Sequence, residues 1–317
     1  SNGKLSPFKL VASLKRPSFL SIDYENRRIY STNLTNFNQS GEIVSFKIKK
    51  GGYLEELNRV SSHGINPCHI QISPNKKILF AVNYGTPSRL KNLDNRAGSI
   101  ASYKILPDGK LSTAVSTYAH KGSGAHQIRQ KDPHAHSVFP HPFDSFVYVP
   151  DLGADTVFSY KYNDQNGELT PHSKNKIDGF AMGPRHMKWD REGKFFYLIN
   201  ELNPSLSVFE YKGNGWIKEI ANINALPDDI NKNELTAAEI RIHPFKPIIY
   251  TTIRDKTIAG RDCISIFSMN GYETKRLKTI SSEVSFPRNF NIDPTGKWLV
   301  IAGQKSRDIA IFSINTN

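Results

Sequence analysis

Apolar and polar residues alternate along much of the chain, and the alternation recurs in units about 50 residues apart. Each unit reads as an alternating run, a polar turn and a second apolar run, as in Pro184–Asn200 with its turn Asp190-Arg191-Glu192-Gly193. A period of two with Val, Ile, Phe and Tyr predicts strands and not helices. The six units begin at Pro17, Pro67, Pro133, Pro184, Ala237 and Pro287.

A third run ending in an aromatic or apolar residue follows each pair, for example SLSVFEY before Lys212, and a weaker fourth run comes next. Four antiparallel strands per unit, repeated at this spacing, are typical of a β-propeller. A solenoid of stacked units is the alternative, although its β-repeats are usually shorter. We therefore predict an all-β chain in which residues 1–317 form a single propeller domain.

The ends of the chain and one interval depart from the repeat. Residues 3–14 (GKLSPFKLVASL) have the pattern of an outer strand, and the sixth unit stops after its third run. The longer interval from Pro67 to Pro133 must hold an insertion. Six units are thus visible: either six blades close with a mixed blade, or the chain lacks pieces of a seventh.

Charge and composition narrow the function classes. Lys and Arg outnumber Asp and Glu by 42 to 29, a formal net charge of +13, which fits either a lysine-rich surface or a field that gathers an anionic small molecule. The sequence contains no run of five Lys or Arg residues, which weakens the case for nucleic-acid binding. It also contains no stretch of 18 apolar residues, so we expect no membrane-spanning segment. Cys68 and Cys263 are too far apart in sequence to indicate a disulfide framework or zinc site. With no visible signal peptide, we expect a cytoplasmic monomer, with secretion as the alternative.

Polar residues interrupt the repeat where a first strand begins and where a second strand ends. Because the two strands are antiparallel, these positions lie at the same end of each unit. Function in a rigid β scaffold collects on such ends, so we expect a site on one rim. The residues placed there are His69, Asn83, His134, His136, Arg185, His186, Glu201, Arg254 and Gln304.

Each of these residues also has a structural interpretation. His134 and His136 have the spacing of a zinc pair if they lie in a strand, but no third ligand is evident. Arg185 and Arg254 could form structural ion pairs, and Glu201 could cap a turn. His141 and His243 adjoin prolines, and we assign them to turns without chemistry.

Several of the same segments resemble one known family. PHAHS from Pro133, GPRHM from Gly183, NEL from Asn200 and AGQKS from Ala302 are similar to motifs of the lactonase seven-bladed propeller family, which includes propeller-type 6-phosphogluconolactonases and a fungal carboxymuconate cyclase. The resemblance runs from about Pro17 to the end. It implies seven blades and an anionic-ligand site on one rim of the channel. The positions matching the site proposed for the cyclase branch are His136, Arg185, Glu201 and Arg254.

Two departures from the family stand out. Most of the blade that the family normally shares between its termini is missing, and Asp255 stands where many members have Gly. The first departure puts closure of the ring in question, and the second could reshape a loop of the pocket.

The resemblance leads to a hypothesis for the chemistry. A lactonase must activate water, stabilise an oxyanion and protonate the leaving alkoxide. We expect His136 or Glu201 to act as the base, and Arg185 and Arg254 to bind a phosphate or carboxylate, with neither metal nor cofactor. A carboxymuconate-type cycloisomerase and a non-catalytic binding module are the alternatives. Residues 86–97 and 226–236 are the loops expected to select the substrate. Further candidates for binding or proton transfer are His69, Asn83, His134, His186 and Gln304.

Overall fold

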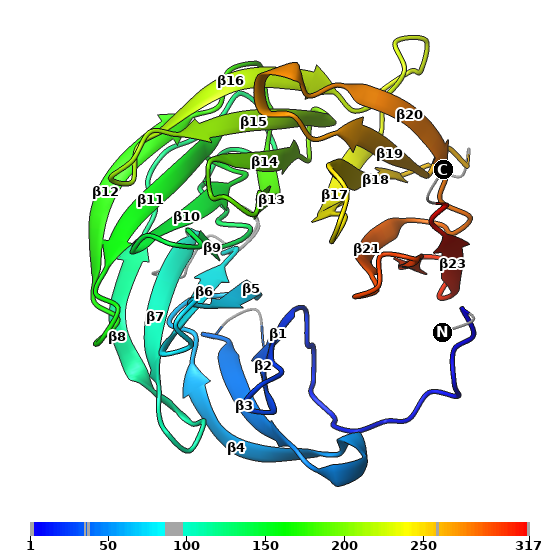
Figure 1. The fold of residues 1–317 in the computed structure, drawn as a ribbon. Coiled ribbons are helices and arrows are strands. Elements are labelled where there is room, and N and C mark those ends of the chain that lie inside the picture. Colours follow the sequence, from blue (N-terminus) through cyan, green and yellow to red (C-terminus); the bar gives the residue numbers. More distant parts are fainter. Residues whose placement is uncertain (1–2, 35, 37–38, 86–97, 258–259, 316–317) are drawn as a thin grey trace. The chain divides into compact units, whose positions relative to one another are not determined.

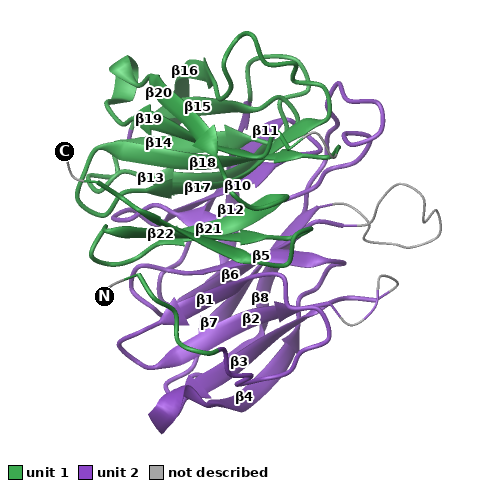
Figure 2. Cartoon of the chain, turned by 90° about the vertical axis from the view of Figure 1, so that its right-hand side faces the viewer, with its two compact units in different colours: residues 1–7, 177–212, 217–317 green, residues 8–176, 213–216 purple. Residues whose placement is uncertain are grey.

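The computed structural model describes residues 3–34, 36, 39–85, 98–257 and 260–315, and its regular structure is almost entirely β (Figure 1). The described chain divides into two compact units. Unit 1 comprises residues 1–7, 177–212 and 217–317, and unit 2 comprises residues 8–176 and 213–216 (Figure 2). The prediction of an all-β fold built from repeated antiparallel sheets is confirmed.

In its described residues, unit 2 contains three four-stranded antiparallel sheets whose strands are neighbours in sequence order. A 3₁₀ turn, η1 (Lys50–Gly52), precedes β4. The first sheet is β1 (Leu20–Asp23), β2 (Arg28–Asn33), β3 (Glu42–Ile48) and β4 (Leu54–Ser61); the second is β5 (Pro67–Ile72), β6 (Ile78–Asn83), β7 (Ser99–Ile105) and β8 (Leu111–Ala119); the third is β9 (Phe139–Pro140), β10 (Phe146–Asp151), β11 (Thr156–Tyr162) and β12 (Leu169–Lys176).

The described part of unit 1 contains two four-stranded sheets and one three-stranded sheet of the same antiparallel type. A second 3₁₀ turn, η2 (Gly271–Glu273), lies before β20. The sheets are β13 (Pro184–Trp189), β14 (Phe195–Asn200), β15 (Ser205–Tyr211) and β16 (Ile217–Asn224); β17 (Leu235–Ile242), β18 (Ile248–Asp255), β19 (Cys263–Ser268) and β20 (Arg276–Ser281); and β21 (Pro287–Ile292), β22 (Trp298–Gly303) and β23 (Ile309–Ser313).

Burial explains why the second run of each repeat is easier to recognise than the fourth. All six residues of β6 are buried, so this strand reads as a continuous apolar run. In β8, by contrast, the residues alternate between covered and exposed positions, and the apolar pattern is diluted. In this sheet the core therefore lies on the inner strand β6 and not on the outer strand β8.

The first strand of most sheets carries a register irregularity directly after it begins. It lies between Pro67 and His69 in β5, between Pro184 and His186 in β13, and between Pro287 and Asn289 in β21. A bulge redirects the side chain at the extra residue, and bulges are common beside active sites. In β13 the residue at this position is Arg185, so the bulge helps to aim one of the predicted site residues.

In four of the sheets, the residue before the first strand has a left-handed backbone, and its carbonyl is hydrogen-bonded to the end of the second strand. Such a residue has positive φ, which Gly and Asn adopt readily and which is less common for larger side chains. The four are Asn66 (φ 59°), Gly183 (φ 67°), Glu234 (φ 63°) and Phe286 (φ 62°), and their carbonyls accept hydrogen bonds from the backbone N–H groups of Tyr84, Glu201, Lys256 and Gln304, respectively.

Two expectations about local structure are wrong. Residues 3–14 form no strand, and Phe8 and Leu10 are 80% and 82% exposed, because no sheet face covers their apolar side chains. His134 and His136 do not lie in a regular strand either: only an isolated bridge from Ala135 to Asp151 precedes the short β9. Of the two loops expected to select the substrate, residues 86–97 lie outside the described part of the chain.

Candidate functional site

A buried glutamate in unit 1 is held by two arginines. Arg185 is the second residue of β13, Glu201 directly follows β14, and Arg254 is the penultimate residue of β18. Pro184 pairs with Asn200 across the β13–β14 ladder, so Arg185 and Glu201 meet at the same end of the sheet. Glu201 Oε2 accepts from Arg185 Nε at 2.8 Å and lies 3.2 Å from Arg254 Nη2. We call Arg185, Glu201 and Arg254 the Arg–Glu–Arg cluster.

The backbone of β17 completes this cluster. Arg254 Nη2 donates to the carbonyl of Ala237 at 2.9 Å, and Arg185 Nη1 donates to the carbonyl of Ala238. Both carbonyls lie at a register irregularity that begins at Ala237. The backbone N–H of Ala237 donates to the Glu201 carbonyl at 3.0 Å, which ties β17 to the end of β14. The two guanidinium groups are thus fixed by one carboxylate and two carbonyls.

The Arg–Glu–Arg cluster is almost closed to solvent. Arg185, Arg254 and Glu201 are 2%, 4% and 5% exposed. Buried charges are tolerated when they are paired and hydrogen-bonded, and this arrangement meets that condition. Two guanidinium groups against one carboxylate leave an excess of one positive charge, which favours an anionic ligand nearby.

His186, the next residue of β13, belongs to a second buried cluster in unit 1. Its Nδ1 lies 3.0 Å from Glu239 Oε1, which also pairs with Arg241 Nη1 at 2.5 Å. Asn289 Nδ2 donates to the other Glu239 oxygen at 2.6 Å. Glu239 is fully buried, so three polar neighbours compensate for its removal from water.

Burial shifts the pKa values around Glu239 in different directions. The pKa of His186 falls to about 4, because burial disfavours the imidazolium more than Glu239 favours it. The pKa of half-buried Lys188 falls to about 7, through burial and then through the charge of Arg241. Burial works against ionisation of Glu239, but Arg241 and His186 hold its pKa well below the usual value. His186 is therefore neutral at neutral pH.

In unit 2, His134 and His136 gather around Tyr84. The His134 ring stacks on Tyr84 with centroids 4.3 Å apart, and its Nδ1 lies 2.8 Å from the Tyr84 carbonyl. The His136 ring meets the same tyrosine edge-on at 5.5 Å. Arg129 Nη2 donates to the Tyr84 hydroxyl at 3.0 Å. Arg129 lies in the insertion between Pro67 and Pro133, so this segment contacts the tyrosine on which the two histidine rings pack. Burial lowers the pKa of His134, although the Tyr84 carbonyl opposes the shift.

His69 and Asn83 are more deeply embedded in unit 2. The His69 ring packs between Phe19 and Phe139 at centroid distances of 4.0 and 4.8 Å. Asn83 is fully buried, and its amide donates to the Ser62 carbonyl at 2.9 Å and to Ser99 Oγ at 3.1 Å. Both amide protons of Asn83 are therefore used to join strand ends, and its role in binding substrate stays a prediction.

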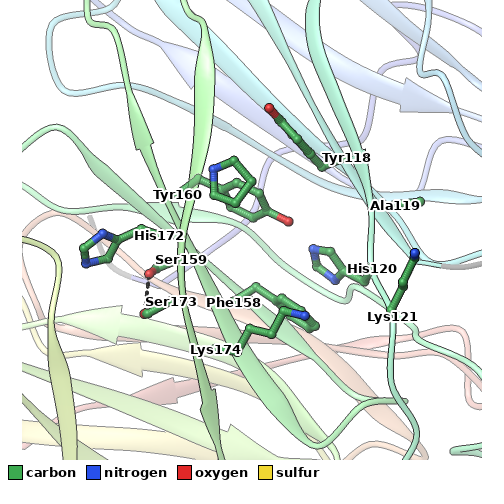
Figure 3. Close-up of a pocket in the computed structure, with 11 residues that line it drawn as sticks. Tyr118, Ala119, His120, Lys121, Phe158, Ser159, Tyr160, His172, Ser173 and Lys174 are labelled. Carbon is green, nitrogen blue, oxygen red and sulfur yellow. Dashed lines mark hydrogen bonds between the residues drawn. The ribbon is translucent and has the colours of Figure 1, made fainter.

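A cavity of about 330 Å³ lies against β8, β11 and β12 in unit 2, lined mainly by rings and lysines (Figure 3). Within it, His120 stacks on Phe158 at 3.9 Å, and its Nδ1 lies 2.7 Å from Asp151 Oδ2. The other oxygen of Asp151 accepts from the backbone N–H of His134 at 2.6 Å. Asp151 thus anchors the segment that carries His134 and His136, and His120 supports that anchor.

The loop ends beside Arg254 are also ordered by specific contacts. Asp255 is fully buried and accepts from Thr257 N at 2.8 Å and from Arg261 Nε at 2.9 Å. Burial opposes ionisation of Asp255, but the bonds from Arg261 and Thr257 lower its pKa strongly. This residue, which departs from the family pattern, therefore shapes the loop after β18. Gln304 is exposed, and its side-chain oxygen accepts from Arg288 Nη1 at 3.5 Å.

Comparison with known proteins places this geometry in a family. The whole chain, residues 1–317, matches the family model described as Lactonase, 7-bladed beta-propeller. The chain belongs to this lactonase family. Its sheets are accordingly blades of a β-propeller, as the repeat predicts.

Relatives in the lactonase family cover nearly all of the chain. It is 30% identical over 312 residues to the 6-phosphogluconolactonase of Bacillus subtilis, covering 97% of this chain and 83% of the relative. It is also 30% identical over 318 residues to the 6-phosphogluconolactonase of Formosa agariphila, covering 98% of this chain and 85% of the relative. A Bacteroides fragilis crystal structure described as a 6-phosphogluconolactonase candidate superposes with a TM-score of 0.82 at 27% identity, over 96% of this chain and 82% of that one.

The structure brings some of the predicted residues together and reveals others. Arg185, Glu201 and Arg254 form one cluster, and the predicted structural ion pairs of both arginines are present as well. Glu239 escaped the sequence analysis, because a single acidic residue inside an apolar strand gives no spacing signal. Tyr84 and Lys305 directly follow the predicted residues Asn83 and Gln304, and Lys305 lies in the AGQKS motif. His120, Arg129 and Phe286 share no motif and were not predicted.

Two expected absences can be examined only in the described residues. There, no three His, Cys, Asp or Glu side chains gather in a way that could hold a metal ion. Nor is any helix of that part long and apolar enough to cross a membrane. Independence from metals, the cytoplasmic location and the monomeric state remain predictions.

Proposed function

We propose that this protein hydrolyses the lactone of a sugar acid, specifically 6-phosphogluconolactone, to the open-chain acid. The observation that carries the proposal is the Arg–Glu–Arg cluster, in which two buried guanidinium groups share one carboxylate oxygen. Its excess positive charge suits both an anionic substrate and the oxyanion of ester hydrolysis. Membership of the lactonase family and two relatives named 6-phosphogluconolactonase support the same substrate.

Hydrolysis of the lactone requires one bond to form and one to break. The oxygen of water attacks the carbonyl carbon and gives up a proton, and the carbonyl oxygen becomes an oxyanion. When the oxyanion collapses, the bond between that carbon and the ring oxygen breaks, and the ring oxygen takes up a proton to become a hydroxyl. Arg185 and Arg254 supply N–H donors to the oxyanion or to the anionic group of the substrate.

Within this scheme, Glu201 and His136 have different roles. Glu201 Oε2 accepts from Arg185 and forms an ion pair with Arg254, so we assign Glu201 to orienting the guanidinium groups. His136 stays the residue predicted from the sequence to take the proton of the attacking water and to return it to the ring oxygen. A histidine suits this exchange because its ordinary pKa lies near neutrality.

The proposed function is tested by measuring acid release from 6-phosphogluconolactone in a pH-stat against the spontaneous rate. We expect the wild type to accelerate ring opening, and Arg254→Met to lower kcat/KM at least about 100-fold, as loss of an oxyanion donor does. Arg59→Gln is the matched control, because Arg59 pairs with Glu56 at the exposed surface of β4. Wild-type protein that does not exceed the spontaneous rate would overturn the proposal.

The role of His136 needs its own variant. His136→Ala should lower kcat about 100-fold or more and abolish the acidic limb of the pH–rate profile, because no imidazole remains to titrate. KM should change little. Unchanged kcat in this variant would remove His136 from the mechanism while leaving the role of the arginines intact.

A further inference from the structure

We propose that Lys305, which Phe286 positions beside Arg254, binds the phosphate of the substrate and makes the site prefer a phosphorylated lactone. This inference rests on the proposed function and deepens it. It concerns the loop after β22, the residue before β21 and the end of β18, which all belong to unit 1.

The arginines of the Arg–Glu–Arg cluster are poorly placed to capture a phosphate from solvent. Arg254 Nη2 already contacts both Glu201 and the Ala237 carbonyl, and Arg185 contacts Glu201 and the Ala238 carbonyl. Both arginines are almost fully buried. A phosphate that arrives from water therefore needs a cation that solvent reaches.

Lys305 is such a cation. It is exposed, and its Nζ donates to the carbonyl of Lys256 at 3.0 Å and to the carbonyl of Asp255 at 3.3 Å. These two residues directly follow Arg254, so the ammonium group is fixed at the end of β18. An ammonium has three N–H donors, and two carbonyls use two of them. The third donor can bind an anion without breaking either contact.

Phe286 connects the two cations. Its ring centroid lies 5.0 Å from the Arg254 guanidinium carbon and 4.9 Å from Lys305 Nζ. Both distances are within the range of a cation–π contact. One aromatic ring thus contacts both cations and helps to fix the Lys305 ammonium beside Arg254, where solvent reaches it.

The backbone of Phe286 is strained for an aromatic residue. Its φ of 62° is left-handed, and the equivalent positions in three other sheets carry Asn66, Gly183 and Glu234. Asn and Gly adopt this conformation readily, whereas it is uncommon for a bulky aromatic residue. Strained residues of this kind concentrate at sites that clamp ligands.

The first test compares two substrates, 6-phosphogluconolactone and unphosphorylated glucono-δ-lactone. For Lys305→Met we expect KM for the phosphorylated lactone to rise at least 10-fold, with kcat within threefold and KM for the unphosphorylated lactone within twofold. Lys305→Arg should restore most of the loss. Lys297→Met is the matched control, because Lys297 is an exposed lysine at the opposite end of the β21–β22 hairpin. Equal changes for both lactones, or no change, would overturn the inference.

The second test replaces the ring without straining the backbone. Phe286→Asn introduces the residue type found at the equivalent left-handed position before β5, which is Asn66. Because Asn adopts this conformation readily, the midpoint of urea unfolding should not fall. KM for the phosphorylated lactone should rise at least fivefold, because Lys305 and Arg254 lose the ring between them. A lower midpoint with an unchanged KM would assign Phe286 to packing alone and contradict its positioning role.

Binding separates failure of this inference from failure of the proposed function. If the wild type lacks lactonase activity, calorimetric titration with 6-phosphogluconate still tests the subsite. Binding that weakens at least 10-fold in Lys305→Met would support the subsite, although the protein would not be a lactonase. Absence of binding would overturn both proposals. An active wild type that does not distinguish the two lactones would overturn the subsite alone.

Discussion

Replacing Glu201 by Gln tests whether the Arg–Glu–Arg cluster is a paired buried charge. The substitution keeps the size of the side chain but removes the carboxylate that contacts both guanidinium groups at 2.8 and 3.2 Å. Each charge-assisted hydrogen bond is worth about 1.5–3 kcal/mol. Removal of one member of a buried pair typically costs about 3–5 kcal/mol, because the remaining charge stays uncompensated. We therefore expect the free energy of unfolding to fall by about 3–5 kcal/mol.

The assay is urea unfolding followed by circular dichroism, with the midpoint and slope fitted together. Glu56→Gln serves as the control, because its pair with Arg59 is 40% exposed on both sides and should contribute less than about 1 kcal/mol. In the double variant Glu201→Gln with Arg254→Met, one uncompensated charge is also removed. Its loss should therefore be smaller than the sum of the single losses by about 1–3 kcal/mol. A loss below about 1 kcal/mol for Glu201→Gln, or strict additivity, would refute the reasoning.

Three further predictions follow from the described contacts. The pKa of His186 in the folded protein is about 4, below its usual value. The contribution of His186 to stability is therefore present above about pH 6.5 and is lost as the pH falls towards 4. The urea midpoints at pH 7 and pH 5 should differ by more in the wild type than in His186→Asn. Gly183→Ala should lower the free energy of unfolding by about 2 kcal/mol in the same assay, because Gly183 has a φ of 67° and a Cβ there would lie 2.6 Å from Leu202 Cγ. An unchanged free energy of unfolding would show that the turn adapts. Incubation with EDTA should leave lactonase activity within about 20% of the untreated rate, as expected of arginine and histidine chemistry without a metal. A loss of activity that a divalent ion restores would contradict the prediction of metal independence.

The sequence predicts the repeat well because each sheet buries its inner strands. Continuous apolar runs such as β6 and turns such as Asp190–Gly193 recur at nearly fixed spacing, and the strands are confirmed at those places. His141 and His243 are confirmed as turn residues: their Nδ1 atoms accept from backbone N–H groups two and three residues later. Local sequence is sufficient for these features, since hydrogen bonds within a turn need no distant partner.

The parts that could not be predicted depend on contacts between distant residues. Residues 3–14 alternate like a strand, but a strand also needs a neighbour, which the pattern does not specify. The bulge that aims Arg185 and the position of Glu239 beside His186 follow from pairing register, which is set by the whole sheet. The two cations that contact Phe286 are Arg254, about 30 positions before it, and Lys305, about 20 positions after it. Neither residue shares a motif with Phe286, so local sequence does not predict the contact.

The central claim is that the two arginines on Glu201 serve lactone hydrolysis. The most direct measurement is kcat/KM for 6-phosphogluconolactone in the wild type, Arg254→Met and the Arg59→Gln control, each corrected for spontaneous opening. We predict clear acceleration by the wild type, a loss of at least about 100-fold in Arg254→Met, and a control within twofold of the wild type. A wild type no faster than the spontaneous reaction, or an Arg254→Met variant as active as the control, would contradict the account.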